Sequence, residues 1–344
     1  MRKEDTMKAV ILAGGKGSRL YPVTRGDIPK PMVPLGGRPV LEWLVLRLRQ
    51  SGIRHICCTL QCLPDAIRNH FGDGSAFGVH MEYRQETEPL GTAGAVKNCR
   101  DFVGEESFFV LSGDGVFDFD LRPLMEAHRR HQSAVTMALS PLASPLSYGL
   151  ALTDRAGRIR GFIEKPDWGR VVTDLVNTGI YVLSPEALEE VPENTAFDFA
   201  GDLFPKLLEQ GRPLFGLPME GYWRDIGEPE SYYQCNLDAL QGRLRLPNSD
   251  SPGKTEKRDP QRRRYRCSAV VETPQRARLM RAVSAALMEA GADFTDGITL
   301  TDAPGGLHIA AAADRSCILV ESDEEDTVRK YKEMADGLRK DADR

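Results

Sequence analysis

Short apolar strands alternate with amphipathic helices through the first 240 residues of the chain. Residues 8–13 have the composition of a buried strand. Residues 40–50 repeat leucine and valine at the i, i+3, i+4, i+7 spacing of one helical face. Repeated strand–helix units of this length predict an α/β fold, with a mostly parallel sheet and helices on both of its faces. Further elements of this kind are strands at 55–60, 79–83 and 108–111 and helices at 64–71 and 92–102.

The pattern loosens after Leu121 and changes in kind after residue 240. Residues 241–266 are polar, rich in proline, serine and charge, and lack apolar periodicity, which predicts a linker. Residues 1–240 are therefore predicted to form one domain and residues 267–344 a small α+β domain. The remaining expected strands lie at 134–139, 149–153, 158–164, 179–183, 297–301, 307–312 and 317–321, some of them antiparallel. The remaining expected helices lie at 202–209, 228–240, 274–290 and 324–339.

Composition narrows the range of partners. The formal net charge is −5, so no global basic field attracts nucleic acid. The chain contains no apolar run of about 18 residues, and the apolar stretch near its start is too short for a signal peptide, so no membrane contact is expected. The seven cysteines lack the paired spacing of a metal site and are typical of thiols in a reducing cytoplasm. We expect a cytoplasmic protein.

A glycine-rich loop follows the first predicted strand and is followed by two cations. Gly14, Gly15 and Gly17 let the backbone approach a ligand closely, but they form neither a GxxxxGKS/T nor a GxGxxG pattern. On their own, the glycines are as consistent with a plain turn as with a loop that binds phosphate. Arg19 and Lys30 favour the cradle, because a cationic pair after such a loop matches a polyphosphate. Two prolines flank Lys30 and restrict its backbone.

Six blocks of the sequence resemble, in order, those of the sugar-1-phosphate nucleotidylyltransferases over residues 7–240. The first is GGKGSRLYPVTRGDIPKPMVPLGGRPVLEW. The others are EPLGTAGAV at 88–96, LSGDGVFDFDL at 111–121, FIEKP at 162–166, NTGIYVLSPEAL at 177–188 and YWRDIGEPESYYQCN at 222–236. The resemblance implies a Rossmann-like (GT-A-type) mixed, mainly parallel sheet. It also implies that an NTP and a sugar 1-phosphate are converted to an NDP-sugar and pyrophosphate, without a protein nucleophile.

The resemblance also implies roles for individual residues. Asp114 and Asp225 would bind one Mg²⁺, with Mn²⁺ left open as the ion used in the cell. Arg19 would hold the leaving phosphates, Lys30 an oxygen near the α-phosphorus, and Lys165 the phosphate of the sugar. The sugar pocket would be formed by Gly149, Glu164, Asn177 and Thr178. The nucleotide would contact the glycine loop and the loop at 88–94, through Leu12, Ala13, Gly14, Gly15, Gly17, Ser18, Gln85, Pro89, Gly91 and Thr92.

The identity of the base and the sugar is less constrained. RQETEPLGTAGAV resembles the mannose-1-phosphate guanylyltransferase branch more than the uridylyl and thymidylyl branches. GTP with mannose 1-phosphate, giving GDP-mannose, is therefore the first expectation. Glucose 1-phosphate with UTP or dTTP is the alternative, and other sugars, including heptose phosphates, stay open. A non-catalytic regulatory subunit is a further alternative, against which the complete set of charged residues argues.

The C-terminal segment resembles the last domain of the phosphohexomutases. In that family an RPSGTEP-like loop binds phosphate, whereas the corresponding residues 310–316 here read AAAADRS. Alanine side chains donate no hydrogen bonds to phosphate, so no mutase activity is expected. A packing, dimerisation or regulatory role for this domain stays open, as does a homo-oligomer.

Overall fold

The computed structural model describes residues 7–247, 265–270, 298–300, 307–311 and 317–322. These residues belong to two compact units. The first unit contains residues 7–33, 38–232 and 244–247. The second contains residues 34–37, 233–243 and the four short ranges after residue 264.

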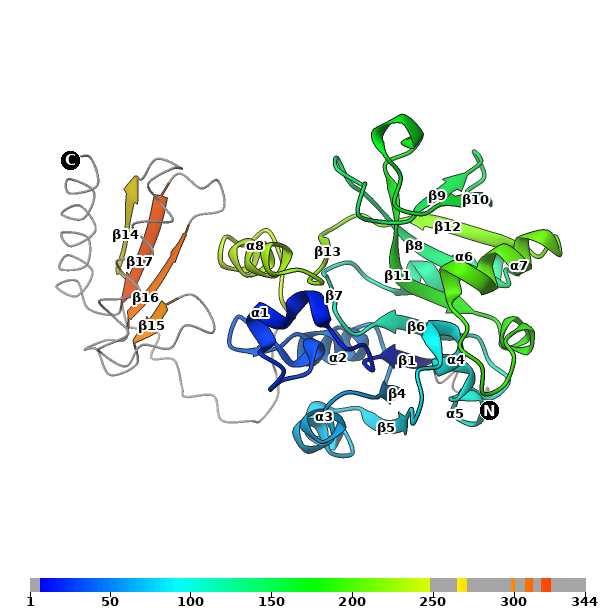
Figure 1. Cartoon of the computed structure of the whole chain (residues 1–344), viewed down its shortest axis with the longest axis horizontal. Helices are drawn as coiled ribbons and strands as arrows, with labels where there is room; N and C mark the ends of the chain where they lie inside the picture. Colours follow the sequence, from blue (N-terminus) through cyan, green and yellow to red (C-terminus); the bar gives the residue numbers. More distant parts are fainter. Residues whose placement is uncertain (1–6, 248–264, 271–297, 301–306, 312–316, 323–344) are drawn as a thin grey trace. The chain divides into compact units, whose positions relative to one another are not determined.

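The first unit is built on a nine-stranded sheet in which seven strands follow the order β10-β9-β11-β6-β1-β4-β5, with β8 pairing to β11 and β12 to β8 (Figure 1). The strands are β1 (Lys8–Leu12), β4 (His55–Leu60), β5 (His80–Gln85), β6 (Phe108–Ser112), β8 (Val135–Pro141), β9 (Leu150–Thr153), β10 (Ile159–Ile163), β11 (Leu175–Leu183) and β12 (Leu214–Pro218). Strands β6, β1, β4 and β5 are mutually parallel, whereas β11 runs antiparallel to β6. The expected mixed sheet with a parallel centre is confirmed.

Helices α2 (Val40–Gln50), α3 (Pro64–Phe71) and α6 (Arg122–His131) contribute to the hydrophobic cluster on one face of this sheet. Helices α4 (Gly91–Lys97), α5 (Arg100–Val103) and α7 (Phe204–Glu209) contribute to the cluster on the other face. The chain also forms α1 (Tyr21–Thr24) and α8 (Pro229–Leu240). Shorter helical turns lie at Ser18–Leu20, Lys30–Met32, Ser75–Phe77, Trp168–Arg170, Pro185–Glu190 and Phe199–Leu203. Between residues 34 and 225, four short strands lie outside the main sheet: β2 (Pro34–Leu35), β3 (Arg38–Pro39), β7 (Gly115–Phe117) and β13 (Trp223–Asp225).

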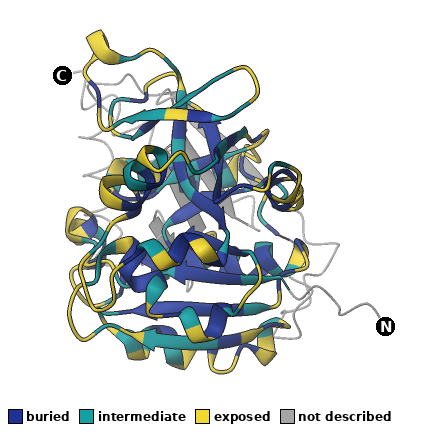
Figure 2. Ribbon diagram, turned by 90° about the vertical axis from the view of Figure 1, so that its right-hand side faces the viewer, coloured by how far each residue is buried: buried dark blue, intermediate teal, exposed yellow. Residues whose placement is uncertain are grey.

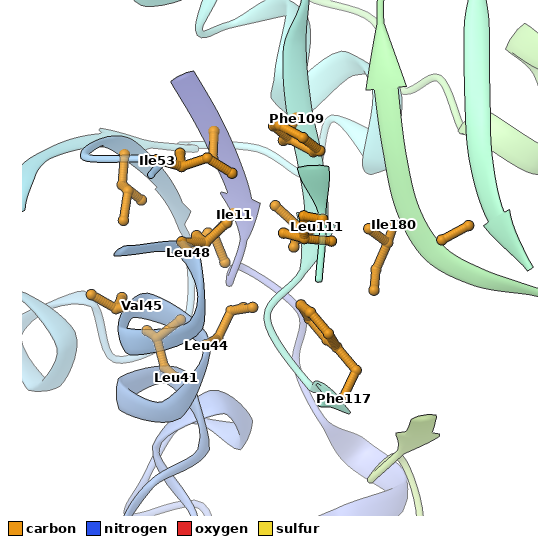
Figure 3. Close-up of a cluster of buried hydrophobic side chains, with 14 of the residues drawn as sticks. Ile11, Leu41, Leu44, Val45, Leu48, Ile53, Phe109, Leu111, Phe117 and Ile180 are labelled. Carbon is orange, nitrogen blue, oxygen red and sulfur yellow. The ribbon is translucent and has the colours of Figure 1, made fainter. Parts of the chain in front are cut away.

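Two hydrophobic clusters occupy the two faces because successive side chains of a strand point to opposite sides. In β1, Ile11 belongs to the cluster under α2 and α3, whereas Val10 belongs to the cluster under α4, α5 and α7. Figure 3 shows Leu41, Leu44 and Leu48 of α2 gathered with Ile11 in the first cluster. The central strands are thus buried on both faces, as Figure 2 also shows.

Some predicted boundaries differ from the structure. The helix expected at 92–102 is divided into α4 and α5, and β11 begins at Leu175 rather than near residue 179. Helix α6 was not predicted, because six of the ten residues in RPLMEAHRRH are arginine, glutamate or histidine and only four of its residues are buried. Strands β7 and β13 are three residues long, which is too short for a periodic signal.

The second unit contains an antiparallel sheet in the order β14-β17-β16-β15. Its strands are β14 (Tyr265–Val270), β15 (Ile298–Leu300), β16 (Leu307–Ala311) and β17 (Cys317–Ser322). Tyr265 and Arg266, which were assigned to the linker, thus belong to β14. The helices expected at 274–290 and 324–339 lie outside the described residues. The domain boundaries proposed from the sequence stay predictions.

Candidate active site

The carboxylates of Asp114 and Asp225 lie close together because the short strand β13 pairs with β7, the strand that follows β6. Strand β13 pairs antiparallel with β7, in a register that places Asp225 opposite Gly115. Next to this pair, the Ile226 N–H donates a hydrogen bond of 3.2 Å to the Asp114 carbonyl. Asp114 lies two residues after the end of β6, at the edge of the sheet where β1 also ends, since Leu12 is in register with Ser112. The carboxyl ends of parallel strands are the usual position of a ligand site in an α/β fold.

The Lys30 ammonium lies between these two carboxylates. Its Nζ forms an ion pair with Asp114 Oδ2 and lies 3.7 Å from Asp225 Oδ1. The Lys30 side chain is only 11% exposed. The glycine loop packs directly on it: Gly17 has φ +59°, and a Cβ there would lie 2.9 Å from the Lys30 Cβ. Only glycine fits this approach without displacing Lys30.

The two carboxylates have opposite pKa shifts. Burial alone would raise the pKa of Asp114, but the Lys30 charge and the hydrogen bonds from Lys30 and Ser112 hold it below its usual value. Burial and the negative charge of Asp114 together raise the pKa of Asp225, and Lys30 offsets only part of this effect. The pair therefore requires positive charge close by.

A divalent cation fits this pair of ligands. Carboxylate oxygens are the ligands that Mg²⁺ prefers, and Lys30 already places a positive charge between them. The described part of the chain contains no group of three or more His, Cys, Asp or Glu side chains able to hold a metal. Asp114 and Asp225 would therefore hold the ion together with water and substrate oxygens, as is usual for Mg²⁺.

A second cation lies beside this group. Arg19 Nη1 is 3.0 Å from Glu228 Oε1, and the Arg19 side chain is 61% exposed. A Cβ on Gly227 would lie 2.8 Å from Asp225 Oδ1, 3.3 Å from Lys30 Nζ and 3.4 Å from Arg19 Nη2. The side chains of Arg19, Lys30 and Asp225 thus surround Gly227, and a glycine at this position leaves room for the three side chains to lie close together. The sequence did not single out Gly227 or Glu228, although both lie in the block at 222–236.

A cavity of about 440 Å³ opens at the same edge of the sheet. The cavity is lined by the end of β1, the start of α4 and residues near the end of β10. Its lining residues are Leu12, Thr92, Ser112, Glu164, Gly179, Tyr181, Asp198, Phe199, Ala200 and Gly201. Leu12, Thr92 and Glu164 were predicted from the sequence to contact substrates, and the other seven were not.

The structure brings together most of the residues expected around the sugar. A Cβ on Gly149 would lie 2.8 Å from Glu164 Oε2, and the Gly149 carbonyl accepts a hydrogen bond of 2.9 Å from the Asn177 N–H. Thr178 differs from Asn177, because its hydroxyl donates to the Ala138 carbonyl at 2.7 Å and is buried. The Thr178 carbonyl also has a partner, since it accepts a hydrogen bond of 3.2 Å from Trp223 Nε1.

Lys165 is exposed and has no hydrogen-bond or ion-pair partner among the described residues. Its φ of +37° is unusual for a residue other than glycine and costs conformational energy. Such strain is common where the chain must direct one side chain toward a ligand. Lys165 directly follows Glu164, which lines the cavity.

The loop before α4 is held by a segment that the sequence did not indicate. The Thr92 N–H and hydroxyl both donate to Asp198 Oδ1 at 2.9 Å. The Phe197 carbonyl accepts from the Ala93 and Gly94 N–H groups, and a Cβ on Gly91 would lie 2.7 Å from that carbonyl oxygen. Residues 197–198 therefore keep the start of α4 in place beside the cavity.

The other predicted nucleotide contacts lie around this loop and the glycine loop. Gly15 and Ser18 are exposed, as are Gln85 at the end of β5 and Pro89. Ala13 is buried, and its N–H donates to the Thr59 carbonyl at 3.1 Å, so this amide is already occupied. We therefore assign Ala13 a place in the strand end rather than a hydrogen bond to the ligand.

No helix among the described residues is both long and apolar enough to cross a membrane. Cys57, Cys58 and Cys99 are buried free thiols, and Cys62 is a partly exposed one. The ion pairs of Lys30 with Asp114 and Asp225, next to the cavity, mark the candidate active site.

Known proteins share this fold and this sequence pattern. The nucleotidyl transferase family profile matches residues 8–242. A UTP–glucose-1-phosphate uridylyltransferase of Synechocystis sp. is 36% identical over 260 residues, which are 72% of this chain and 66% of that protein. A mannose-1-phosphate guanylyltransferase of Mycobacterium tuberculosis is 35% identical over 235 residues, 68% of this chain and 65% of that protein. The chain thus spans just under two thirds of the length of these relatives.

A solved structure extends the comparison. HddC from Yersinia pseudotuberculosis, crystallised with GMP-PN, is 31% identical and superposes with a TM-score of 0.59 over 67% of this chain and 98% of its own. The family profile covers more than half of the chain, and the fold and the order of sequence blocks agree with it. The chain therefore belongs to the nucleotidyl transferase family, with sugar-1-phosphate nucleotidylyltransferases among its relatives.

Proposed function

We propose that the protein transfers a nucleotidyl group from an NTP to a sugar 1-phosphate, with release of pyrophosphate, in a reaction that depends on a divalent metal. The position of the Lys30 ammonium between Asp114 and Asp225, at the strand ends beside the cavity, carries this proposal. Enzymes of this family generally depend on a divalent metal. Mg²⁺, when bound by Asp114 and Asp225, would neutralise charge on the phosphates.

In the proposed reaction, a phosphate oxygen of the sugar 1-phosphate attacks the α-phosphorus of the NTP in line with the leaving group. A new P–O bond forms as the bond to the β-phosphate oxygen breaks, and the electron pair leaves with pyrophosphate. Lys30 holds an oxygen at the α-phosphorus, Arg19 releases Glu228 to hold the leaving phosphates, and Lys165 holds the attacking phosphate. Glu164 accepts hydrogen bonds from sugar hydroxyls and orients the nucleophile.

We further propose GTP and mannose 1-phosphate as the substrates. The similarity to a relative named mannose-1-phosphate guanylyltransferase supports this choice, as does the HddC structure with GMP-PN, by its name a guanine nucleotide. The relative named UTP–glucose-1-phosphate uridylyltransferase favours the alternative, UTP or dTTP with glucose 1-phosphate. The two alternatives share the mechanism and differ in the groups that contact the base and the sugar.

Pyrophosphate release from all four common NTPs and dTTP, each with mannose 1-phosphate and glucose 1-phosphate, tests the proposal. We expect turnover with GTP and mannose 1-phosphate in Mg²⁺, and none in EDTA. A preference for UTP or dTTP with glucose 1-phosphate would keep the reaction and replace the substrates. A folded protein that binds nucleotide but is inactive with every pair would instead be a regulatory subunit.

Arg19→Ala and Lys165→Ala are each expected to lower kcat/KM by roughly 10², since each removes a cation from developing phosphate charge. Because both side chains are exposed, the fold should keep its stability. Steady-state kinetics with both substrates varied is the measurement. Arg122→Ala and Lys206→Ala are the controls, because they break an exposed and a partly exposed ion pair away from the site. Near-normal turnover in either test variant would remove that residue from the proposed mechanism.

A further inference from the structure

A buried carboxylate that the proposed mechanism does not use lies at the end of the β7–β13 pair that is farther from Asp114. Asp118 directly follows β7, and its side chain is only 1% exposed. Its Oδ1 accepts a hydrogen bond of 2.8 Å from the Tyr222 N–H, and its own N–H donates to the Tyr222 carbonyl at 3.1 Å. Asp118 thus binds Tyr222, the residue directly before β13, through two hydrogen bonds.

These two hydrogen bonds extend the pairing of β7 with β13 by one position. The pairing contains three residue pairs, of which the last places Asp225 opposite Gly115. Asp118 and Tyr222 form the next pair at the other end, where the Asp118 carboxylate accepts from an N–H that the paired strand would otherwise have to satisfy. Two paired strands of this length are marginally stable by themselves, so the hydrogen bonds at their end help to fix the register.

A change of this register would remove a proposed metal ligand. Successive side chains of a strand point to opposite sides, so a shift by one residue turns every side chain of β13 to the other face. Arg224 or Ile226 would then lie opposite Gly115 in place of Asp225. Neither side chain offers the oxygen ligands that Mg²⁺ requires. The place of Asp225 therefore depends on the register that Asp118 supports.

The second oxygen of Asp118 is also occupied. Oδ2 accepts a hydrogen bond of 3.1 Å from the Arg245 N–H, and Arg245 Nε lies 3.4 Å from the same oxygen. The Arg245 carbonyl accepts in turn from Nη2 of Arg47, in α2, at 2.5 Å. These contacts fix the direction of the carboxylate. Because both oxygens have protein donors, Asp118 is placed to orient β13 rather than to bind a metal ion itself.

The chain before Tyr222 approaches the same carboxylate closely. Gly221 has φ +136°, and a Cβ there would lie 2.6 Å from Asp118 Oδ1. Alanine at this position would therefore displace the carboxylate from the Tyr222 N–H. This substitution offers a second way to break the contact while Asp118 itself is kept.

We propose that Asp118 is a positioning residue for the metal centre, which keeps β13 in the register that brings Asp225 to Asp114. This inference rests on the proposed function, because it concerns the metal ligands of the same reaction. Asp118 acts through the Tyr222 backbone and contacts neither substrate nor metal. Loss of a residue that orients a metal ligand commonly lowers metal affinity by a factor of about 10 to 100.

Asp118→Ala and Asp118→Asn test this role. Alanine removes both acceptors, whereas asparagine keeps an oxygen for the Tyr222 N–H. We expect Asp118→Ala to weaken Mn²⁺ binding by roughly tenfold or more and to raise the Mg²⁺ concentration for half-maximal activity by a similar factor. The KM for the sugar 1-phosphate should stay unchanged, and Asp118→Asn should bind Mn²⁺ nearly as well as the wild type. EPR of Mn²⁺ with the nucleotide-free protein and kinetics across a Mg²⁺ titration are the measurements.

Thr136→Val is the control for a general loss of stability. It removes a buried hydrogen bond of 3.1 Å between Thr136 Oγ1 and His128 Nδ1, outside the candidate active site. This variant should have a lower melting temperature and unchanged Mn²⁺ binding. If Asp118→Ala does not fold, Gly221→Ala takes its place, with the same expected loss of Mn²⁺ affinity.

Three results would overturn the inference. The first is wild-type Mn²⁺ affinity in folded Asp118→Ala or, in its place, Gly221→Ala. The second is an equal loss in Asp118→Asn or in Thr136→Val, and the third is a wild type that binds no Mn²⁺. A wild type that binds Mn²⁺ but turns over no NTP would refute the proposed function alone, and the Mn²⁺ measurements would still decide the role of Asp118.

Discussion

Lys30→Met should lower kcat/KM roughly 10³-fold and the free energy of unfolding by about 3 kcal/mol. The loss of activity follows from removing a cation at the reacting phosphorus. The loss of stability follows because Asp114 and Asp225 would then lie close together without the ammonium between them. Steady-state kinetics and denaturant unfolding without metal measure the two effects.

Mg²⁺ provides a second readout for this variant. Because the two carboxylates would lack any cation, added Mg²⁺ should raise the melting temperature of Lys30→Met more than that of the wild type. Arg122→Met is the control for stability, since its ion pair with Asp120 is exposed and contributes less than about 1 kcal/mol. A Lys30→Met protein as stable as the wild type in EDTA would show that Lys30 does not hold the carboxylate pair together.

Asp114→Asn should lower kcat roughly 10³-fold and require more Mg²⁺ for half-maximal activity, since it removes one of two proposed metal ligands. Lys30 keeps its contact with Asp225 at 3.7 Å, so the fold should lose less stability than in Lys30→Met. Kinetics across a titration of Mg²⁺ is the measurement.

Asp120→Asn is the control for this substitution, because Asp120 is a turn residue whose carboxylate accepts from the Arg122 N–H and side chain. It should leave both kcat and the Mg²⁺ requirement unchanged. Asp114→Asn with activity within tenfold of the wild type would exclude Asp114 as a metal ligand.

The centre of the fold could be predicted because its signals are local. Strands β1, β4 and β6 are apolar on both faces, and α2 repeats its apolar residues at helical spacing, so each segment indicated its own structure. The bounds of α2, β4 and α3 agree with those predicted. Helix α6 was missed because exposed charges dominate its composition.

The candidate site was predicted in part. Arg19, Lys30, Asp114 and Asp225 were identified from the order of sequence blocks, and the structure places them together. The buried hydroxyl of Thr178 and the hydrogen bonds between Thr92 and Asp198 had no signal, because they join segments distant in sequence.

By itself, the sequence determined the alternating strands and helices, the glycine loop at the end of β1 and the residue types that suit phosphate chemistry. These follow from periodicity, backbone freedom and charge, which neighbouring residues encode. Only the tertiary structure decided that β13 pairs with β7, which brings Asp225 to Asp114, and that Asp198 accepts hydrogen bonds from Thr92 at the start of α4. Such contacts depend on pairing between distant segments, and a three-residue strand carries too little local pattern to specify its partner.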